Sequence, residues 1–257
     1  MRWAIVFATV VMAVPAFAQD DPALITELNV EQAEKLIVSN ADYLNLFSLT
    51  SLSPDVAKIL AKFDGELYLD HLPTISVEAA AAFSDRDGKL SLAGLTEVTD
   101  EQAEALARHK GWLALSGIKG LSAHQAELLA SHEGGLFFFS LTSLSAEQAE
   151  ALAKHQDALC LAGLTKLSPE LAEKLAKHRG YLSLDRVATL SPQEAKSLAN
   201  HQGELDLGGL KTLSIEAAEA LSKHEDWLHL EGLVVLSEDA VAALRANRKI
   251  RLPEDFR

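Results

Sequence analysis

The sequence is poor in cysteine and in basic residues. Its single thiol, Cys160, cannot form an internal disulfide, so the fold has to be stabilised by packing even in an oxidising compartment. Only 23 Lys and Arg stand against 37 Asp and Glu, which gives a formal net charge of −14. A surface this acidic repels phosphate backbones, so nucleic acid is excluded as an expected partner.

Long apolar runs are missing after the first residues of the chain. Arg2 precedes the apolar stretch from Trp3 to Val14, and Ala16-Phe17-Ala18 matches a signal-peptidase site. This pattern predicts a secretory signal peptide over residues 1–18, cleaved after Ala18. No later segment approaches the roughly 20 apolar residues that a membrane span needs. We therefore expect a secreted or periplasmic protein without a membrane span.

Catalytic signatures are also missing. The chain has no G-x-S-x-G, no H-E-x-x-H, no phosphate-binding loop and no paired Cys and His. Regular repeats place equivalent residues in equivalent environments, whereas acid–base catalysis needs environments that differ. An enzyme is not expected, and the sequence assigns neither a catalytic residue nor a cofactor.

A strict internal repeat dominates what is present. A Leu-x-Leu or Leu-x-Phe step recurs every 23 residues without a slip. Its first leucines are Leu44, Leu67, Leu90, Leu113, Leu136, Leu159, Leu182, Leu205 and Leu228. A shortened tenth copy, Ile250-x-Leu252, follows after 22 residues. Such a period is the signature of a repeat architecture, in which each unit buries its apolar face only against its neighbours.

Each unit contains the signals of a strand, a turn and a helix. The alternating apolar step predicts a short strand, and a Ser or Thr nine residues after the first leucine predicts a helix N-cap. Apolar residues at i, i+3 and i+4 then give one buried helical stripe. Glycines beyond the helix predict left-handed C′ positions. They are Gly65, Gly88, Gly111, Gly134, Gly180 and Gly203.

The consistent local signals predict a right-handed α/β solenoid of about nine 23-residue repeats. A parallel sheet should line one face, which we expect to be concave, and helices should line the other. The signal peptide (1–18) is followed by an N-terminal cap with the first helix (19–43), the solenoid (44–244) and a C-terminal cap (245–257).

The Leu-x-Leu strand, the following Leu-x-x-Leu and a helix on this period resemble bacterial leucine-rich repeats. The resemblance covers residues 24–252 and implies an interaction protein that binds other proteins through its concave sheet. The chain departs from the family pattern in one respect. Apolar residues such as Leu49, Leu95 and Leu210 occupy the register in which the family carries an asparagine ladder.

Six histidines occupy one register of consecutive repeats: His109, His132, His155, His178, His201 and His224. Their place in the last helical turn favours a structural role, in which imidazole bonds free carbonyls at the helix end. A column of imidazoles can also bind transition metals. Phe63 and Arg86 fill the same register in earlier repeats, which favours packing and capping over coordination.

The registers that the repeat leaves variable flank the strand leucines and hold most of the aromatic residues. Exposed aromatic side chains are typical of binding hot spots. The candidate partner-binding residues are Tyr43, Phe47, Tyr68, Trp112, Phe137, Phe139, Tyr181 and Trp227. The sequence thus predicts a monomeric scaffold that binds a protein or peptide through its strand face. A metal-binding protein and a structural envelope component are the alternatives.

Overall fold

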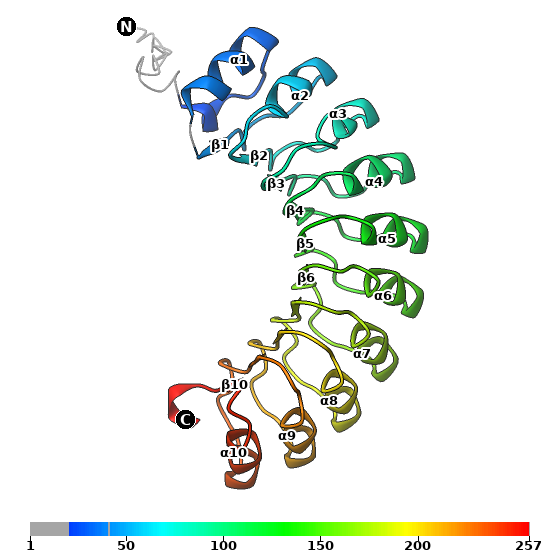
Figure 1. Ribbon diagram of the computed structural model, residues 1–257, viewed down its shortest axis with the longest axis vertical. Helices are drawn as coiled ribbons and strands as arrows, with labels where there is room; N and C mark the ends of the chain where they lie inside the picture. The colour runs from blue at the N-terminus through cyan, green and yellow to red at the C-terminus, as the bar shows by residue number, and fades with distance from the viewer. Residues whose placement is uncertain (1–20, 41, 257) are drawn as a thin grey trace, which may run out of the picture.

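Each copy of the 23-residue repeat folds as one short strand, a turn and one helix. The computed structural model describes residues 21–40 and 42–256. Its units stack into an open arc, with the strands on the inner side and the helices on the outer side (Figure 1). The expected α/β solenoid with a concave strand face is confirmed. The predicted signal peptide lies outside the described residues.

The strands form one parallel sheet in chain order. Neighbouring strands pair in a constant register of 23 residues, as Leu67 with Leu90, and the last step is 22 residues, Leu228 with Ile250. The strands are β1 (Tyr43–Asn45), β2 (Glu66–Tyr68), β3 (Leu90–Ser91), β4 (Leu113–Ala114), β5 (Leu136–Phe137), β6 (Leu159–Cys160), β7 (Leu182–Ser183), β8 (Leu205–Asp206), β9 (Leu228–His229) and β10 (Ile250–Arg251).

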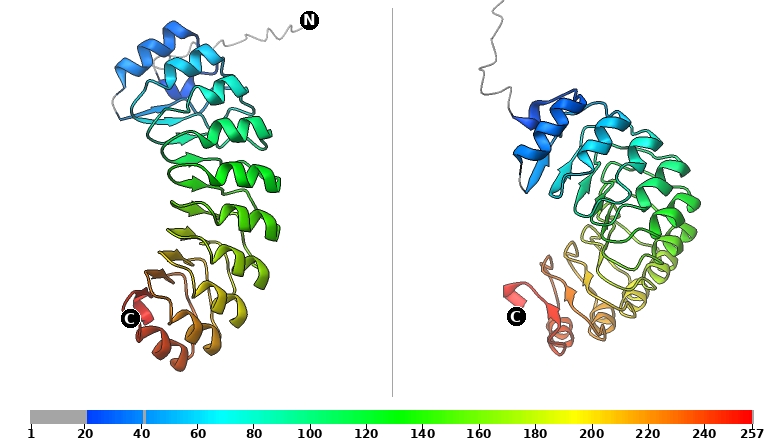
Figure 2. Two further views of the ribbon diagram at one scale, coloured as in Figure 1. Left: turned by 45° about the vertical axis from the view of Figure 1, so that its right-hand side comes forward. Right: turned by 45° about the horizontal axis from the view of Figure 1, so that its top comes forward.

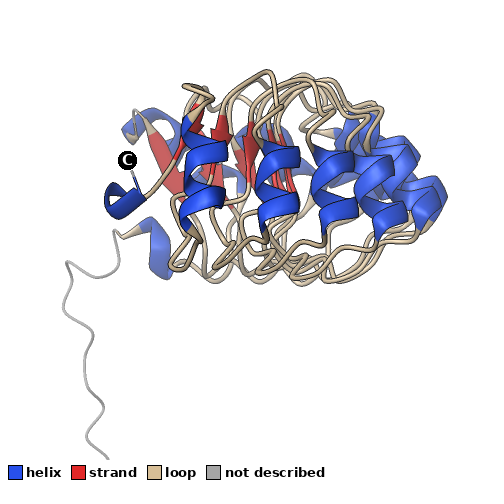
Figure 3. Ribbon diagram, turned by 90° about the horizontal axis from the view of Figure 1, so that it is seen from below, coloured by secondary structure: helices blue, strands red, loops and turns tan. Residues whose placement is uncertain are grey.

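The helices form the second layer, which two further views separate clearly from the strands (Figures 2 and 3). They are α1 (Val30–Ser39), α2 (Pro54–Leu60), α3 (Val77–Ala81), α4 (Asp100–Ala107), α5 (Ala123–Ala130), α6 (Ala146–Leu152), α7 (Pro169–Leu175), α8 (Pro192–Leu198), α9 (Ile215–Leu221) and α10 (Glu238–Arg245). Short 3₁₀ helices, η2 (Pro22–Leu24) and η3 (Glu254–Phe256), lie near the two ends.

The predicted helix starts are confirmed in every unit. Each of α2 to α10 follows a Ser or Thr whose hydroxyl accepts a hydrogen bond from the third amide of the helix, as Ser53 does from Val56 at 3.3 Å. Asn29 caps α1 in the same way. The caps satisfy amides that have no partner within the helix, so they fix where each helix begins.

The core lies between the two layers and is made mainly of leucine and alanine. Both apolar residues of the first nine strand steps are fully buried, as Leu90 and Leu92 are, whereas Ile250 of the tenth is partly buried. The register of the missing asparagine ladder is also buried, since Leu49, Leu95 and Leu210 are fully inaccessible. Small alanines on the helices let adjacent units approach closely. The core is therefore continuous along the arc.

Glutamine side chains join neighbouring units in part of the stack. In three capping boxes the glutamine binds the N-cap amide and also donates to a carbonyl 27 residues earlier. These pairs are Gln102 with Ile75 (2.5 Å), Gln125 with Val98 (2.9 Å) and Gln148 with Leu121. Buried side-chain bonds between units therefore exist without an asparagine ladder.

The glycines beyond the helices follow the predicted geometry only in part. Positive φ occurs at Gly88, Gly134, Gly180 and Gly203, whereas the left-handed conformation expected at Gly65 and Gly111 is wrong. A Cβ at Gly111 would lie 2.2 Å from the Gly88 carbonyl oxygen. Glycine is required there because the backbones of successive units nearly touch.

The ends of the arc carry short additional segments. At the N-terminal end α1 packs on α2, and Leu36 is partly buried against the core. At the C-terminal end Phe256 of η3 packs against the core, and the carbonyl of Phe256 accepts a hydrogen bond from Arg245. Within the part of the chain that the structure describes, no helix has the length and apolarity needed to cross a membrane.

Candidate functional site: the strand face and the histidine column

The six histidines form a continuous stack inside the solenoid. Successive ring centroids are 5.7 to 6.2 Å apart and the ring planes are inclined by 2° to 23°. Every one of the six side chains is buried, with at most 3% of its surface exposed. The column is therefore an internal row and is not part of the protein surface.

Four of the six imidazoles hydrogen-bond to the preceding unit through Nε2, which is assigned as the donor because its partner is a backbone carbonyl. The pairs are His132 with Gly111 (2.7 Å), His178 with Asp157 (2.9 Å), His201 with Gly180 (2.9 Å) and His224 with Gly203 (3.0 Å). The expected bonding to each histidine's own helix end is wrong. The imidazoles connect units rather than capping helices.

His109 and His155 differ from the other four. Within the described residues neither ring nitrogen of either one reaches a hydrogen-bond partner. Backbone groups of Ala130 and Gly134 lie near His155 and favour its charged form, but neither meets hydrogen-bond geometry. His109 lacks even that support, and the charges of His132 and Arg86 disfavour its protonation.

Burial disfavours the charged form of five imidazoles of the column: His109, His132, His155, His178 and His201. Desolvation, followed by the charges of His132 and Arg86, lowers the pKa of His109 to about 3. Desolvation and the neighbouring histidines lower the pKa of His178 to about 4. Desolvation also lowers the pKa of His132, His155 and His201. A neutral imidazole can donate one hydrogen bond without placing a charge in the core.

Other residues continue the same register beyond the histidines. Phe63 and Arg86 precede them, and both are 4% exposed. Arg86 donates to the Gly65 carbonyl, the contact that the histidines make in later units. Asn247 follows His224 and donates to its carbonyl at 2.7 Å. The register thus provides a buried or half-buried side chain, which in Arg86, Asn247 and four of the histidines bonds to the preceding unit.

The geometry does not favour the metal-binding alternative. The rings lie face over face, so their nitrogens do not converge on a common point, and metal binding needs converging ligands. Among residues 21–40 and 42–256, no group of three or more His, Cys, Asp and Glu side chains could hold a metal ion. The neutral column is explained by packing and by bonds between units.

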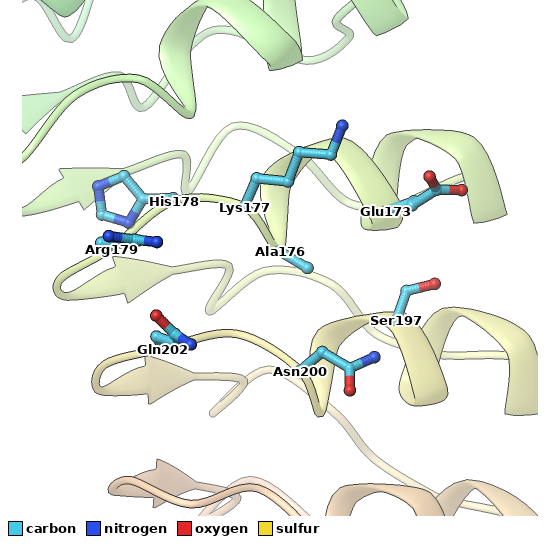
Figure 4. A pocket seen from close by; sticks show the side chains of 8 residues that line it. All are labelled: Glu173, Ala176, Lys177, His178, Arg179, Ser197, Asn200 and Gln202. Carbon is cyan, nitrogen blue, oxygen red and sulfur yellow. The ribbon is translucent and has the colours of Figure 1, made fainter.

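A hollow of 380 Å³ lies near one edge of the helix layer and includes His178 in its lining. Its other side chains come from the end of α7, from α8 and from the loops that follow them. Figure 4 shows the ring of His178 directed toward the strands, while Lys177 and Glu173 extend away from it. These side chains do not converge, so the hollow has no arrangement suited to catalysis.

The structure places the eight predicted binding residues along the concave face at different degrees of exposure. Tyr43, Trp112, Phe139 and Trp227 are exposed, at 62%, 55%, 45% and 45%. The half-buried residues are Phe47, Tyr68, Phe137 and Tyr181. Tyr43 and Phe47 lie at the N-terminal end of the sheet and Trp227 lies at β9, so only some of the eight come together.

Three of these residues form what we call the central aromatic patch: Trp112, Phe137 and Phe139. The Trp112 and Phe137 rings are 5.1 Å apart and tilted by 36°, and Phe137 and Phe139 are 6.5 Å apart. Gly135 makes room for this cluster, because a Cβ there would lie 2.8 Å from the Phe137 ring. The patch therefore has a defined shape on the inner face.

Small side chains form the floor around the patch. Ala114, Cys160 and Ala162 are 8%, 6% and 2% exposed. Burial raises the pKa of the Cys160 thiol. A thiol that stays protonated is a poor nucleophile, so Cys160 acts as a small apolar side chain beneath its neighbours.

A hollow of 660 Å³ borders the patch at the glycine edge of the sheet. It is lined by Asp42, Asp64, Gly65, Glu66, Gly88, Lys89, Gly111 and Trp112. The only Lys or Arg in this lining is Lys89. Its ammonium lies 3.0 Å from the Tyr68 hydroxyl, 4.7 Å from the centre of that ring and 3.9 Å from Glu66. We call this site the glycine-edge hollow.

Acidic residues follow on the other side of the patch. Asp206 of β8 accepts a hydrogen bond from the Tyr181 hydroxyl at 3.1 Å, and Asp185 follows β7. Burial and the charge of Asp206 raise the pKa of Asp185, while Arg186 acts in the opposite direction. At β9, His229 lies 2.6 Å from Glu204 and 3.3 Å from Glu231. We call Asp185 and Asp206 the acidic pair.

The flanking acids were not among the residues singled out from the sequence. The sequence contains a signal for them in the distribution of charge over the variable registers. Those registers carry no charged residue in β4 to β6 and four carboxylates in β7 to β9. The sequence contains no such signal for the glycine-edge hollow, because the residues that line it come from four different units.

No protein-family model matches the sequence, and no curated protein matches it either. Among solved structures, the chain is similar to a leucine-rich-repeat protein of Leptospira interrogans, with 19% identity over 82% of this chain and 71% of that one and a TM-score of 0.35. It is also similar to an internalin from Listeria monocytogenes, with 12% identity, 88% and 76% coverage and a TM-score of 0.41. The leucine-rich-repeat-like architecture rests on this chain's own parallel strands and helices, since likenesses at these TM-scores do not carry it.

Proposed function

We propose that the chain is a non-catalytic binding scaffold that holds a protein or peptide through its concave strand face. The observation that carries this proposal is the central aromatic patch. Trp112 and Phe139 are about half exposed, and the variable positions of β4 to β6 around them carry no charged side chain. Clustered aromatic side chains of this kind are typical of interaction hot spots.

We test this function by replacing Trp112 and Phe139 with Asp. A crosslinking pull-down from the native extracytoplasmic fraction should lose its partner with this variant, because two charges would be buried in the interface. The matched control replaces Val38 and Val234, exposed valines outside the concave face, with Asp. Capture by the control should equal that of the unmodified chain, and both variants should keep the original far-UV spectrum.

If the Trp112 and Phe139 variant captures the same partner as the unmodified chain, the strand face is not the binding surface. If the unmodified chain captures nothing, the result favours the alternative of a structural envelope component. A monomeric chain is expected throughout, which light scattering of the purified protein checks.

Export is part of the proposal and rests on the N-terminal sequence. The apolar stretch and the Ala16-Phe17-Ala18 motif support cleavage after Ala18. N-terminal sequencing of the protein recovered from outside the cytoplasm should then begin at Gln19. Recovery of the uncleaved chain from the cytoplasm would contradict it.

A further inference from the structure

The centre of the concave face can receive an apolar group without burying a charge. The variable positions of β4 to β6 are Trp112, Ala114, Ser116, Gly135, Phe137, Phe139, Ala158, Cys160 and Ala162. Cys160 is the one ionisable side chain among them. Burial raises the pKa of its thiol, so it stays protonated at neutral pH. An apolar side chain placed over the variable positions of β4 to β6 therefore covers no carboxylate or ammonium of these strands.

The face becomes acidic on the C-terminal side of this centre. The variable positions of β7 to β9 contain Asp185, Glu204, Asp206 and Glu231 and no Lys or Arg. Glu204 and Glu231 both contact His229. Among the described residues, no salt bridge involves the acidic pair, Asp185 and Asp206, and the nearby cation Arg186 does not offset their mutual repulsion.

The face is also acidic on the N-terminal side of the patch. The glycine-edge hollow presents Asp42, Asp64 and Glu66 against the single ammonium of Lys89. Arg86 lies below the surface and interacts with Asp64. Trp112 belongs both to this hollow and to the patch, so an aromatic ring and the carboxylates line the same hollow. Aromatic faces and carboxylates together favour Lys and Arg side chains.

The spacing of these features defines the length of a partner. Glu66 and Trp112 are two strands apart, and so are Phe137 and Asp185. At about 4.8 Å per strand, each acidic site lies roughly 10–15 Å from the patch once Asp42 and Asp206 are included. An extended chain covers this distance in about three or four residues.

We infer that the strand face binds a cationic segment of another protein, with one large apolar side chain on the central aromatic patch and Lys or Arg about three or four residues away on both sides. This inference rests on the proposed function. A second copy of the chain is a poor occupant, because its formal net charge of −14 would repel the acidic flanks.

The experiment selects a random-peptide display library against the full chain. We expect the recovered peptides to share an aromatic or large aliphatic residue with Lys or Arg at the stated spacing. Recovery should depend on Trp112 and Phe139, and the variant with Asp at both positions should bind none of these peptides.

A synthetic peptide from this selection then separates charge from the apolar anchor. Asp185→Asn with Asp206→Asn should weaken its binding about fivefold, and the difference should shrink in high salt. The matched control is Glu34→Gln with Glu219→Gln, which removes the same charge from exposed positions on helices. It should leave the dissociation constant unchanged.

The outcomes distinguish the inference from the function it rests on. Neutral or acidic peptides that require Trp112 and Phe139 overturn the inference and leave the binding scaffold intact. Equal weakening by the control variant also overturns it, because the effect would then be due to net charge alone. A library that yields no peptide dependent on Trp112 and Phe139 counts against the proposed function itself.

Discussion

The histidine column and the strand face are registers of the same 23-residue repeat, yet they differ in almost every physical respect. The column holds six identical side chains, all buried and stacked ring on ring. The variable strand positions range from Gly135 to Trp112 and are exposed to different degrees. Repetition of a side chain thus marks a contact between units, and variation marks a surface that the stack does not constrain.

Acidification should destabilise the fold through the histidine column, and this is the largest change in the free energy of unfolding that we expect. In the unfolded chain imidazoles protonate near pH 6.5, whereas burial in the folded chain lowers the pKa of His109, His132, His155, His178 and His201. Their contribution to stability is therefore complete above about pH 6.5 and is lost as the pH falls toward the lowered folded-state pKa. At pH 5, His109 and His178, with pKa values of about 3 and 4, together cost up to about 4 kcal/mol.

His132, His155 and His201 act in the same direction, since burial lowers the pKa of each. The measurement is the urea midpoint, followed by circular dichroism at pH 7.5, 6 and 5. A midpoint that stays constant over this range would show that the column does not resist protonation.

The column contains histidines that bond to the preceding unit and histidines without a partner, and substitutions of the two kinds should affect stability differently. His201→Leu should lower the free energy of unfolding by about 1–3 kcal/mol, because the buried Gly180 carbonyl loses its donor. His109→Leu should be close to neutral or stabilising, because both of its nitrogens already lack a partner. Chemical denaturation at pH 7.5 measures both variants, and equal losses would contradict the assignment of the His201 bond.

Truncation on the strand face should have the smallest effect on stability. Trp112→Ala removes a ring that is 55% exposed, so the free energy of unfolding should change by no more than about 0.5 kcal/mol. The same urea experiment at pH 7.5 checks this, with His201→Leu as the destabilised reference. A loss as large as that of His201→Leu would mean that the ring stabilises the stack.

Most of the fold could be predicted from the sequence because its signals are local and repeated. The N-cap at Ser53 and its equivalents depends on a few adjacent residues, so a single sequence contains the information. The bond from Gln125 to Val98 and the close approach of Gly111 to Gly88 depend on the distance between units. That distance is set by core packing along the whole stack, and no local pattern encodes it.

The candidate site was predictable in its aromatic part only. Trp112 and Phe139 stand out because large rings are unusual in registers not committed to the core. The burial of Cys160 could not be predicted, since it depends on how its neighbours fold over it. The walls of the glycine-edge hollow could not be predicted either, because Asp42 and Trp112 are distant in sequence and line one hollow only through the stacking of the units.

The constant register also fixes how far apart in sequence the contacting residues of neighbouring units lie. The histidine and glutamine bonds between units join residues 21 or 27 positions apart, as His201 and Gly180 or Gln125 and Val98 do. A one-residue deletion changes the spacing of the pairs that span it, whereas loss of a whole unit, such as residues 157–179, places equivalent residues side by side again. Unit deletion would bring the aromatic patch and the acidic pair closer by one strand, about 4.8 Å. Adding or removing units between two surface features therefore changes the length of the segment that such a chain can bind.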